Sequence, residues 1–251
     1  MTPTAVVTGA SSGIGRGVAV RLAESGYDLA LVGRDRDRLG EVASAVRAQG
    51  REVAEIPADL ADADADATSA IVEPAVALGG GIDVVVNCAA VIAVEPFEQV
   101  SASEFDRHWN VNLRAPFMLT QACLPWLRRS ANPSVINVSS ASARLVRRGQ
   151  SLYGTTKAAL EHLTRILAAE LAADGIRVNA IAPGPVDTPI HASWSADPDE
   201  ARRWLVDQVP LGRIGTVDDV AGWVVWLVSP GASWTTGAVV RVDGGQVLDP
   251  R

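Results

Sequence analysis

The sequence has few of the residues that mark several large classes of protein. It contains two cysteines, Cys88 and Cys123, and neither has a second cysteine or a histidine nearby at metal-ligand spacing. We therefore expect no disulfide framework and no metal site, but buried thiols in a protein of the reducing cytoplasm. No apolar run is long enough to span a bilayer, and a strand-like run begins within a few residues of Met1, so neither a membrane anchor nor a secretory leader is expected.

Basic residues are also scarce relative to acidic ones. Lys and Arg number 22 against 29 Asp and Glu, which gives a formal net charge of -7 and no electrostatic support for binding nucleic acid. Hydrophobic residues, by contrast, make up 48% of the 251 residues. This content suits one domain over residues 1–251 with a sizeable core, and no linker divides the chain.

Apolar strand-like runs alternate with amphipathic stretches along the whole chain. Helices are expected between the runs, for example over Arg36–Gln49 and Tyr153–Ala173. Strands rich in Val and Ile and separated by helices predict an α/β fold with a doubly wound, seven-stranded parallel sheet, Rossmann-like, in a single domain. Ligands of such sheets bind at the carboxyl ends of the strands. The runs lie within Ala5–Val7, Tyr27–Gly33, Arg51–Leu60, Ile82–Ala90, Ser134–Ser140, Ile176–Gly184 and Ala238–Gly245.

A glycine-rich segment, TGASSGIG, follows the first of these runs over Thr8–Gly15. A turn between a strand and a helix that is rich in glycine commonly holds a phosphate, because N–H groups at the helix N-terminus point at the anion. The spacing of Gly9, Gly13 and Gly15 differs from the G-x-G-x-x-G fingerprint of dinucleotide sites. A tight turn that only packs strand against helix is the alternative for this segment.

Tyr153 and Lys157 stand four residues apart in YGTTK, at the start of an expected helix. This spacing places both on one helix face, where an ammonium group favours phenolate and lowers the pKa of the tyrosine. Ser140, at the end of the fifth expected strand, could reach the same point. An exposed Tyr and Lys on a surface helix is the alternative.

The ordered set of motifs resembles the short-chain dehydrogenase/reductase family over essentially the whole chain. The resemblance is to the single-domain branch that includes the 3-oxoacyl-(acyl carrier protein) reductases. The matching segments, in family order, are TGASSGIG, NCAA (Asn87–Ala90), VNL (Val111–Leu113), INVSS, YGTTK, APGPVDT (Ala182–Thr188), PLGRIGTVDDVA and TGAVVRVDGG.

This resemblance implies roles for four catalytic residues. Tyr153 exchanges a proton with the carbonyl or alcohol oxygen, Ser140 hydrogen-bonds that oxygen, and Lys157 binds the nicotinamide ribose and lowers the tyrosine pKa. Asn112 holds a water in the proton relay. The family usually has Gly where Ala90 and Ala115 stand here, and Pro116 follows Ala115, so a local change in the helix near Asn112 is expected.

The resemblance also implies the residues of the cofactor site. Gly9, Ser12, Gly13 and Ile14 line the phosphates, with Ser11 and Gly15 in the same loop; Asp59 and Leu60 flank the adenine; Asn87 and Ala89 contact its ribose region; and Pro183, Gly184, Val186 and Thr188 hold the nicotinamide, beside Tyr153 and Lys157.

The end of the second expected strand bears on which nicotinamide cofactor is used. A member selective for NAD would place Asp there, but this chain has Gly33 followed by Arg34. A guanidinium matches a 2′-phosphate in charge and geometry, so NADP(H) is favoured over NAD(H).

A substrate lid is expected at about residues 188–209, where His191, Trp194, Trp204 and Leu205 could shape an apolar pocket or merely pack a lid helix. Leu145, Val146 and Gln150 are expected on the opposite wall, and none of these seven residues carries a charge that would select an acid. Apolar residues on the helix after Tyr153, together with Trp223 and Trp226, predict a homotetramer.

The expected function is therefore hydride transfer between NADP(H) and a small-molecule carbonyl or secondary alcohol, as in a ketone or 3-oxoacyl reductase. An NAD-dependent alcohol or sugar dehydrogenase is one alternative. A sugar-nucleotide epimerase or dehydratase is disfavoured by the short chain. A non-catalytic regulator that senses a dinucleotide could dispense with Ser140, Tyr153 and Lys157, yet all three are present.

Overall fold

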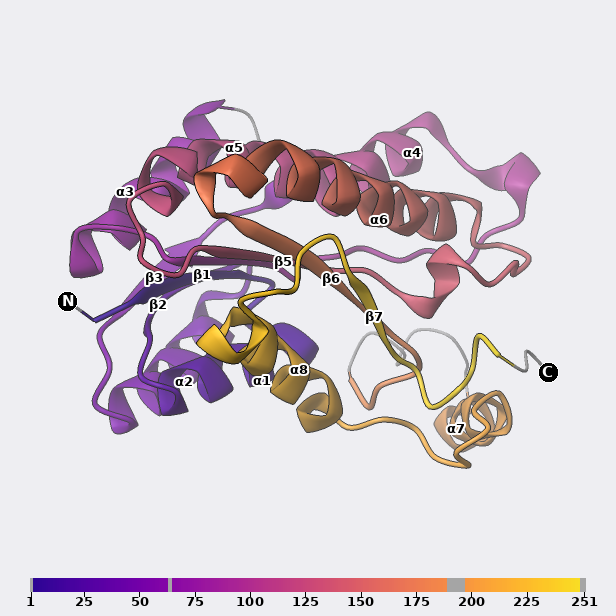
Figure 1. Ribbon diagram of the computed structural model, residues 1–251. Coiled ribbons are helices and arrows are strands. Elements are labelled where there is room, and N and C mark those ends of the chain that lie inside the picture. Colours follow the sequence, from indigo (N-terminus) through magenta and orange to yellow (C-terminus); the bar gives the residue numbers. More distant parts are fainter. Residues whose placement is uncertain (1, 63–64, 189–196, 249–251) are drawn as a thin grey trace.

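A parallel sheet lies at the centre of the molecule (Figure 1). The structure is a computed structural model that describes residues 2–62, 65–188 and 197–248, and within these its sheet has seven strands in the order β3-β2-β1-β4-β5-β6-β7. This arrangement confirms the predicted fold class. The strands are β1 (Thr4–Thr8), β2 (Asp28–Gly33), β3 (Val53–Pro57), β4 (Val84–Asn87), β5 (Ser134–Val138), β6 (Arg177–Pro183) and β7 (Val239–Val242).

Helices cover both faces of the sheet, as Figure 1 shows. One layer holds α1 (Gly13–Glu24), α2 (Arg36–Ala48) and α8 (Val217–Val228), and the other holds α3 (Ala65–Gly79), α4 (Ala102–Trp109), α5 (Ala115–Leu127) and α6 (Ser151–Leu171). Helix α7 (Pro198–Asp207) lies apart from both layers, near the end of the described chain. Among the described helices, none is both long and apolar enough to cross a membrane.

Burial on both faces explains why the central strands are apolar throughout rather than alternating. In β1, Val7 belongs to the core under α1, α2 and α8, whereas its neighbour Val6 belongs to the core under α3 and α5. All five residues of β1 are buried. Ala5, Val6 and Val7 therefore all face apolar neighbours on one side of the sheet or the other, which is the usual pattern of a parallel sheet.

The order of the strands reverses at β1, which pairs with β2 on one side and with β4 on the other. The loops that follow β1 and β4 meet there, because the Thr8 hydroxyl accepts hydrogen bonds from the backbone N–H groups of Cys88 (3.0 Å) and Ala89 (3.1 Å). A side chain on Gly9 would place its Cβ 2.9 Å from the Ala89 backbone. The first glycine thus lets two loops approach closely at the point where ligands of such sheets bind.

Candidate active site

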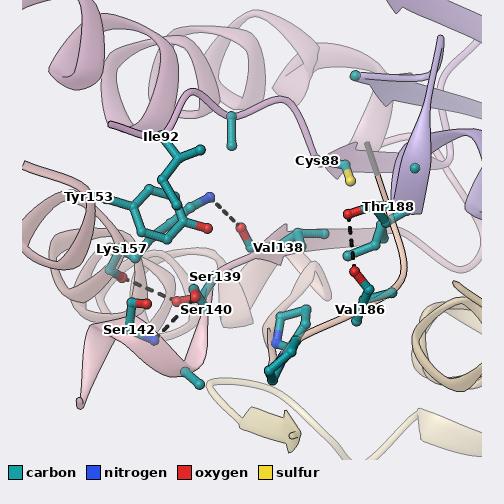
Figure 2. A pocket seen from close by; sticks show the side chains of 18 of the residues that line it. Cys88, Ile92, Val138, Ser139, Ser140, Ser142, Tyr153, Lys157, Val186 and Thr188 are labelled. Carbon is teal, nitrogen blue, oxygen red and sulfur yellow. Dashed lines mark hydrogen bonds between the residues drawn. The ribbon is translucent and has the colours of Figure 1, made fainter. Parts of the chain in front are cut away.

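A cavity of about 190 Å³ opens at the carboxyl edge of the sheet (Figure 2). Loops after β1, β4, β5 and β6, the start of α6 and part of α7 form its wall. The predicted cofactor residues that line it are Gly9, Ser12, Gly13, Ile14, Gly15, Ala89, Tyr153, Lys157, Pro183, Gly184, Val186 and Thr188.

Ser140, Tyr153 and Lys157 lie together in this wall (Figure 2). Tyr153 and Lys157 occupy the first two turns of α6, and both are buried. Ser140 directly follows β5 and caps the short helical turn Ala141–Ala143, since its Oγ accepts a hydrogen bond from the Ser142 N–H at 3.1 Å. This bond uses a lone pair of the Ser140 oxygen and leaves its O–H to donate to the Tyr153 oxygen or to a bound substrate.

Burial controls the ionisation of the two residues on α6. It raises the pKa of Tyr153 above its ordinary value, and the hydrogen bond with Ser140 offsets part of this rise. Burial also lowers the pKa of Lys157 to about 8, and the Lys157 Nζ donates a hydrogen bond to the Val138 carbonyl at 2.7 Å. The sequence predicts a lowered pKa for Tyr153, but in the structure this pKa is raised. The reason is that desolvation of the phenolate outweighs its hydrogen bonding. Tyr153 is held as a protonated phenol.

Asn112 lies in a π-helical turn, Asn110–Arg114, between α4 and α5. Its Oδ1 accepts from the Val91 N–H at 2.9 Å, and its Nδ2 donates to the Val91 carbonyl (3.0 Å) and the Thr156 hydroxyl (3.1 Å). The side chain thus ties the loop after β4 to α6. Pro116 has no N–H, so the α-helical hydrogen bond to the Asn112 carbonyl cannot form, and the π turn is the local change expected there.

A second, smaller hollow borders the cavity at the end of β2. The predicted residues Ser11, Arg34, Asp59 and Leu60 line it, together with Gly33, Ser12 and Ala89. The Arg34 guanidinium lies 3.9 Å from the Asp59 carboxylate, and both side chains are exposed. The structure therefore brings the predicted adenosine end and the predicted phosphate loop together.

Asn87 was expected near the adenine ribose, but its side chain is buried beneath the site. Its Nδ2 donates to the Thr120 hydroxyl at 3.2 Å and to Asn137 Oδ1 at 2.8 Å, and Asn137 in turn donates to the Thr164 hydroxyl at 2.9 Å. These bonds connect β4 and β5 with α5 and α6. Asn87 supports the floor of the site rather than presenting its side chain to the cavity.

The expected substrate wall is only partly as predicted. Gln150 and Leu205 line the cavity, but Val146 is fully exposed and Leu145 is half-buried outside the lining. Arg147 and Gln246, which the sequence did not single out, line the cavity instead. The segment that holds Arg147 has no periodic pattern, so nothing in it indicated which side chains point inward. His191 and Trp194 lie outside the described residues.

Comparison with known proteins agrees with this geometry. A family model described as enoyl-(acyl carrier protein) reductase matches residues 9–246. The 3-oxoacyl-(acyl carrier protein) reductase of Staphylococcus aureus is 35% identical over 249 residues, which are 99% of each chain. This chain belongs to the short-chain dehydrogenase/reductase family.

Further relatives of this short-chain dehydrogenase/reductase act on different molecules. The L-xylulose reductase of Bos taurus is 39% identical over 243 residues, 96% of this chain and 95% of the relative. The solved structure of an angucycline C-6 ketoreductase with bound NADP matches at a TM-score of 0.90 and 32% identity, covering 98% of this chain and 97% of that one. The chain is thus an oxidoreductase, and its family uses a nicotinamide dinucleotide with a small-molecule substrate.

Proposed function

We propose that this short-chain dehydrogenase/reductase is an NADP(H)-dependent enzyme that interconverts a ketone and a secondary alcohol. The observation that supports this proposal is the position of Ser140, Tyr153 and Lys157 in one cavity wall that continues into the glycine loop. A regulator that only senses a dinucleotide has no need of a buried tyrosine hydroxyl beside a serine and a lysine there.

The phosphate loop fits a dinucleotide. Gly9 and Gly13 have φ angles of +68° and +52°, which residues with side chains rarely adopt. Helix α1 begins at Gly13, has no side-chain cap at Ser12, and carries no acidic residue in its first turn. The N–H groups and the positive end of the helix dipole are therefore open to the diphosphate.

Four residues of the chain have separate roles in the proposed reaction. A bound nicotinamide supplies the hydride for reduction or accepts it in oxidation. Tyr153 donates its proton to the carbonyl oxygen as negative charge develops there, and the Ser140 hydroxyl donates a hydrogen bond to the same oxygen. Lys157 binds the nicotinamide ribose, and Asn112 holds a water in the proton relay.

Arg34 supports NADP(H) over NAD(H). It lies in the hollow at the end of β2, where Gly33 presents no carboxylate to repel a 2′-phosphate. We expect Arg34→Leu to lower kcat/KM for NADPH by at least about tenfold, which corresponds to the loss of one charge-assisted hydrogen bond. The same variant should change kcat/KM for NADH little. An equal effect on both cofactors, measured by steady-state kinetics, would contradict this assignment.

The experiment that tests the proposed activity is a panel of ketones assayed with NADPH and with NADH by loss of nicotinamide absorbance. Oxidation of NADPH that depends on a ketone is the expected result. Tight NADPH binding without turnover on any ketone or secondary alcohol would instead favour a dinucleotide-sensing regulator. Turnover with NADH alone would favour an NAD-dependent alcohol or sugar dehydrogenase.

Two apolar surfaces support a homotetramer. One is on the layer of α4–α6, where Phe105, Phe117 and Ile166 are exposed, and the other is on α8, where Trp223 and Trp226 are exposed. Two different self-complementary surfaces on one chain generate a tetramer with dihedral symmetry.

The free thiols of Cys88 and Cys123 support a location in a reducing cytoplasm.

A further inference from the structure

The described wall of the cavity contains three amide or guanidinium side chains that the reaction does not use. Arg147, Gln150 and Gln246 all line the wall that also holds Tyr153. They come from different parts of the chain, since Arg147 and Gln150 precede α6 and Gln246 follows β7. Polar groups that converge on a substrate cavity usually fix the position and class of the substrate.

Arg147 is a cation without a carboxylate partner among the described residues. The neighbouring Arg144 lies 3.5 Å from Glu161, and Arg202 lies 3.1 Å from Asp187, but Arg147 instead stacks its guanidinium 5.3 Å from the centre of the Trp204 ring. Burial lowers its pKa, although an arginine remains charged. The described wall of the cavity contains no Asp or Glu, and the sequence between residues 189 and 196 contains none either.

The two glutamines are nearly inaccessible and yet incompletely bonded. Gln150 is 8% exposed and Gln246 is 3% exposed. Gln150 Oε1 and Gln246 Nε2 are buried and have no hydrogen-bond partner among the residues that the structure describes. Buried amide groups normally have partners, so two unpartnered amides in one cavity wall indicate a missing ligand. Rotation about the last side-chain bond exchanges the oxygen and nitrogen of Gln150, so both glutamines can present donors.

We propose that Arg147, Gln150 and Gln246 form a carboxylate-binding subsite, and that the substrate of this enzyme is an oxo acid rather than a neutral ketone. The proposal rests on the proposed ketone reduction and narrows its substrate class. A guanidinium and two amides supply planar N–H donors, which match the two oxygens of a carboxylate. One cation balances a carboxylate, whereas a phosphate dianion would leave negative charge uncompensated in a wall with one free arginine.

The first test compares oxo acids with their own methyl esters, in which a methyl group replaces the negative charge. We expect wild-type enzyme with NADPH to show a higher kcat/KM for at least one of acetoacetate, 4-oxopentanoate and 5-oxohexanoate than for the matching ester. The preferred chain length then measures the reach from Tyr153 to the subsite. Equal or better reduction of all three esters would overturn the proposal, as would a preference for dihydroxyacetone phosphate over every acid.

The second test removes the guanidinium. We expect Arg147→Met to lower kcat/KM for the preferred acid on the order of ten- to hundredfold, mainly through KM, and to affect the ester much less. Arg147→Lys keeps the charge and should recover part of the loss. Arg148→Met is the matched control, since Arg148 is the adjacent, exposed arginine. This variant should leave kcat/KM unchanged for both the acid and the ester. Equal losses for acid and ester in Arg147→Met would show that Arg147 only supports Trp204 and would overturn the proposal.

A binding measurement separates failure of this proposal from failure of the proposed activity. Calorimetric titration of the wild-type NADPH complex with the three acids and their esters needs no turnover. Tighter binding of an acid, weakened by Arg147→Met and not by Arg148→Met, would support the subsite even if no ketone were reduced. Reduction of the esters without selective binding of any acid would overturn the subsite and leave the ketone reductase standing.

Discussion

Tyr153 shows how the surroundings of one side chain set its chemical role. Its ring is buried at the start of α6, and burial raises the pKa of the phenol. A phenol that stays protonated through neutral pH can donate a proton at every turnover in the direction of reduction. Lys157 is buried one turn further along the same helix, so the pair shares a low-dielectric environment that penalises both charges.

Tyr153→Phe should lower kcat for ketone reduction by about 10²–10⁴-fold, because the variant keeps the ring and loses the proton donor. Binding of NADPH, measured by fluorescence titration, should change little. The chain has one other tyrosine, Tyr27, which does not line the cavity, so Tyr27→Phe is the matched control. Retention of wild-type kcat by Tyr153→Phe on an active ketone would contradict the assignment.

The lowered pKa of Lys157 has a consequence for stability. The folded value is about 8 against 10.5 for a free lysine, so the unfolded chain binds more protons between these values and the burial penalty falls as pH rises. The free energy of unfolding of the wild type should therefore rise relative to that of Lys157→Met from about pH 8 to 10.5, as measured by urea denaturation. Cys88 and Tyr153 are present in both proteins, so their titrations largely cancel. A constant difference across this range would contradict the prediction.

Among the secondary-structure elements, α8 begins with a capping box formed by Thr216 and Asp219. Asp219 accepts from the Thr216 N–H at 2.7 Å, its own N–H donates to the Thr216 hydroxyl at 3.2 Å, and both carboxylate oxygens contact Arg213. The hydrogen bonds from Arg213 contribute most to holding the pKa of this carboxyl well below its usual range. This capping box fixes where the helix begins and so where it meets α1.

Asp219→Ala should lower the free energy of unfolding by about 1 kcal/mol, the usual effect of losing a helix cap. The difference from wild type should shrink as pH falls below about 4, where the carboxylate of the unfolded chain takes up its proton first. Asp218→Ala is the control, because Asp218 is exposed in the same helical turn and does not form the capping box. Equal losses in the two variants, by chemical denaturation, would refute the role of the cap.

The elements of this fold were predictable to different degrees. All seven strands could be located because each lies within a short run rich in Val, Ile, Leu and Ala, and the Tyr153–Lys157 spacing placed both residues on one helix face. The segment from Arg144 to Gly149 could not be oriented, because a loop has no period that tells inward from outward side chains. Val146 therefore points to solvent and Arg147 into the cavity, opposite to what their hydropathy suggests.

For the whole molecule, the proposed assembly is open to direct measurement. Trp223 and Trp226 pack edge to face, with ring centres 5.8 Å apart, and each remains more than 40% exposed. We expect light scattering to give the mass of four chains at micromolar concentration. Trp226→Glu should reduce this to two chains by placing a charge in one of the two interfaces, whereas a monomeric wild type would refute the tetramer.

The close packing of α1 against α8 has a consequence for how the chain is made. Gly17 of α1 meets Val217 of α8, and a Cβ on Gly17 would lie 2.0 Å from the Val217 side chain. The Thr8 hydroxyl meets the Cys88 N–H, 80 residues further along the chain. A nascent chain leaving the ribosome therefore has β1 unpaired on one side until β4 emerges, and its first helix uncovered until α8 does. Native packing of the first helix cannot be completed before nearly the whole chain has been synthesised, so this helix stays accessible to chaperones throughout synthesis.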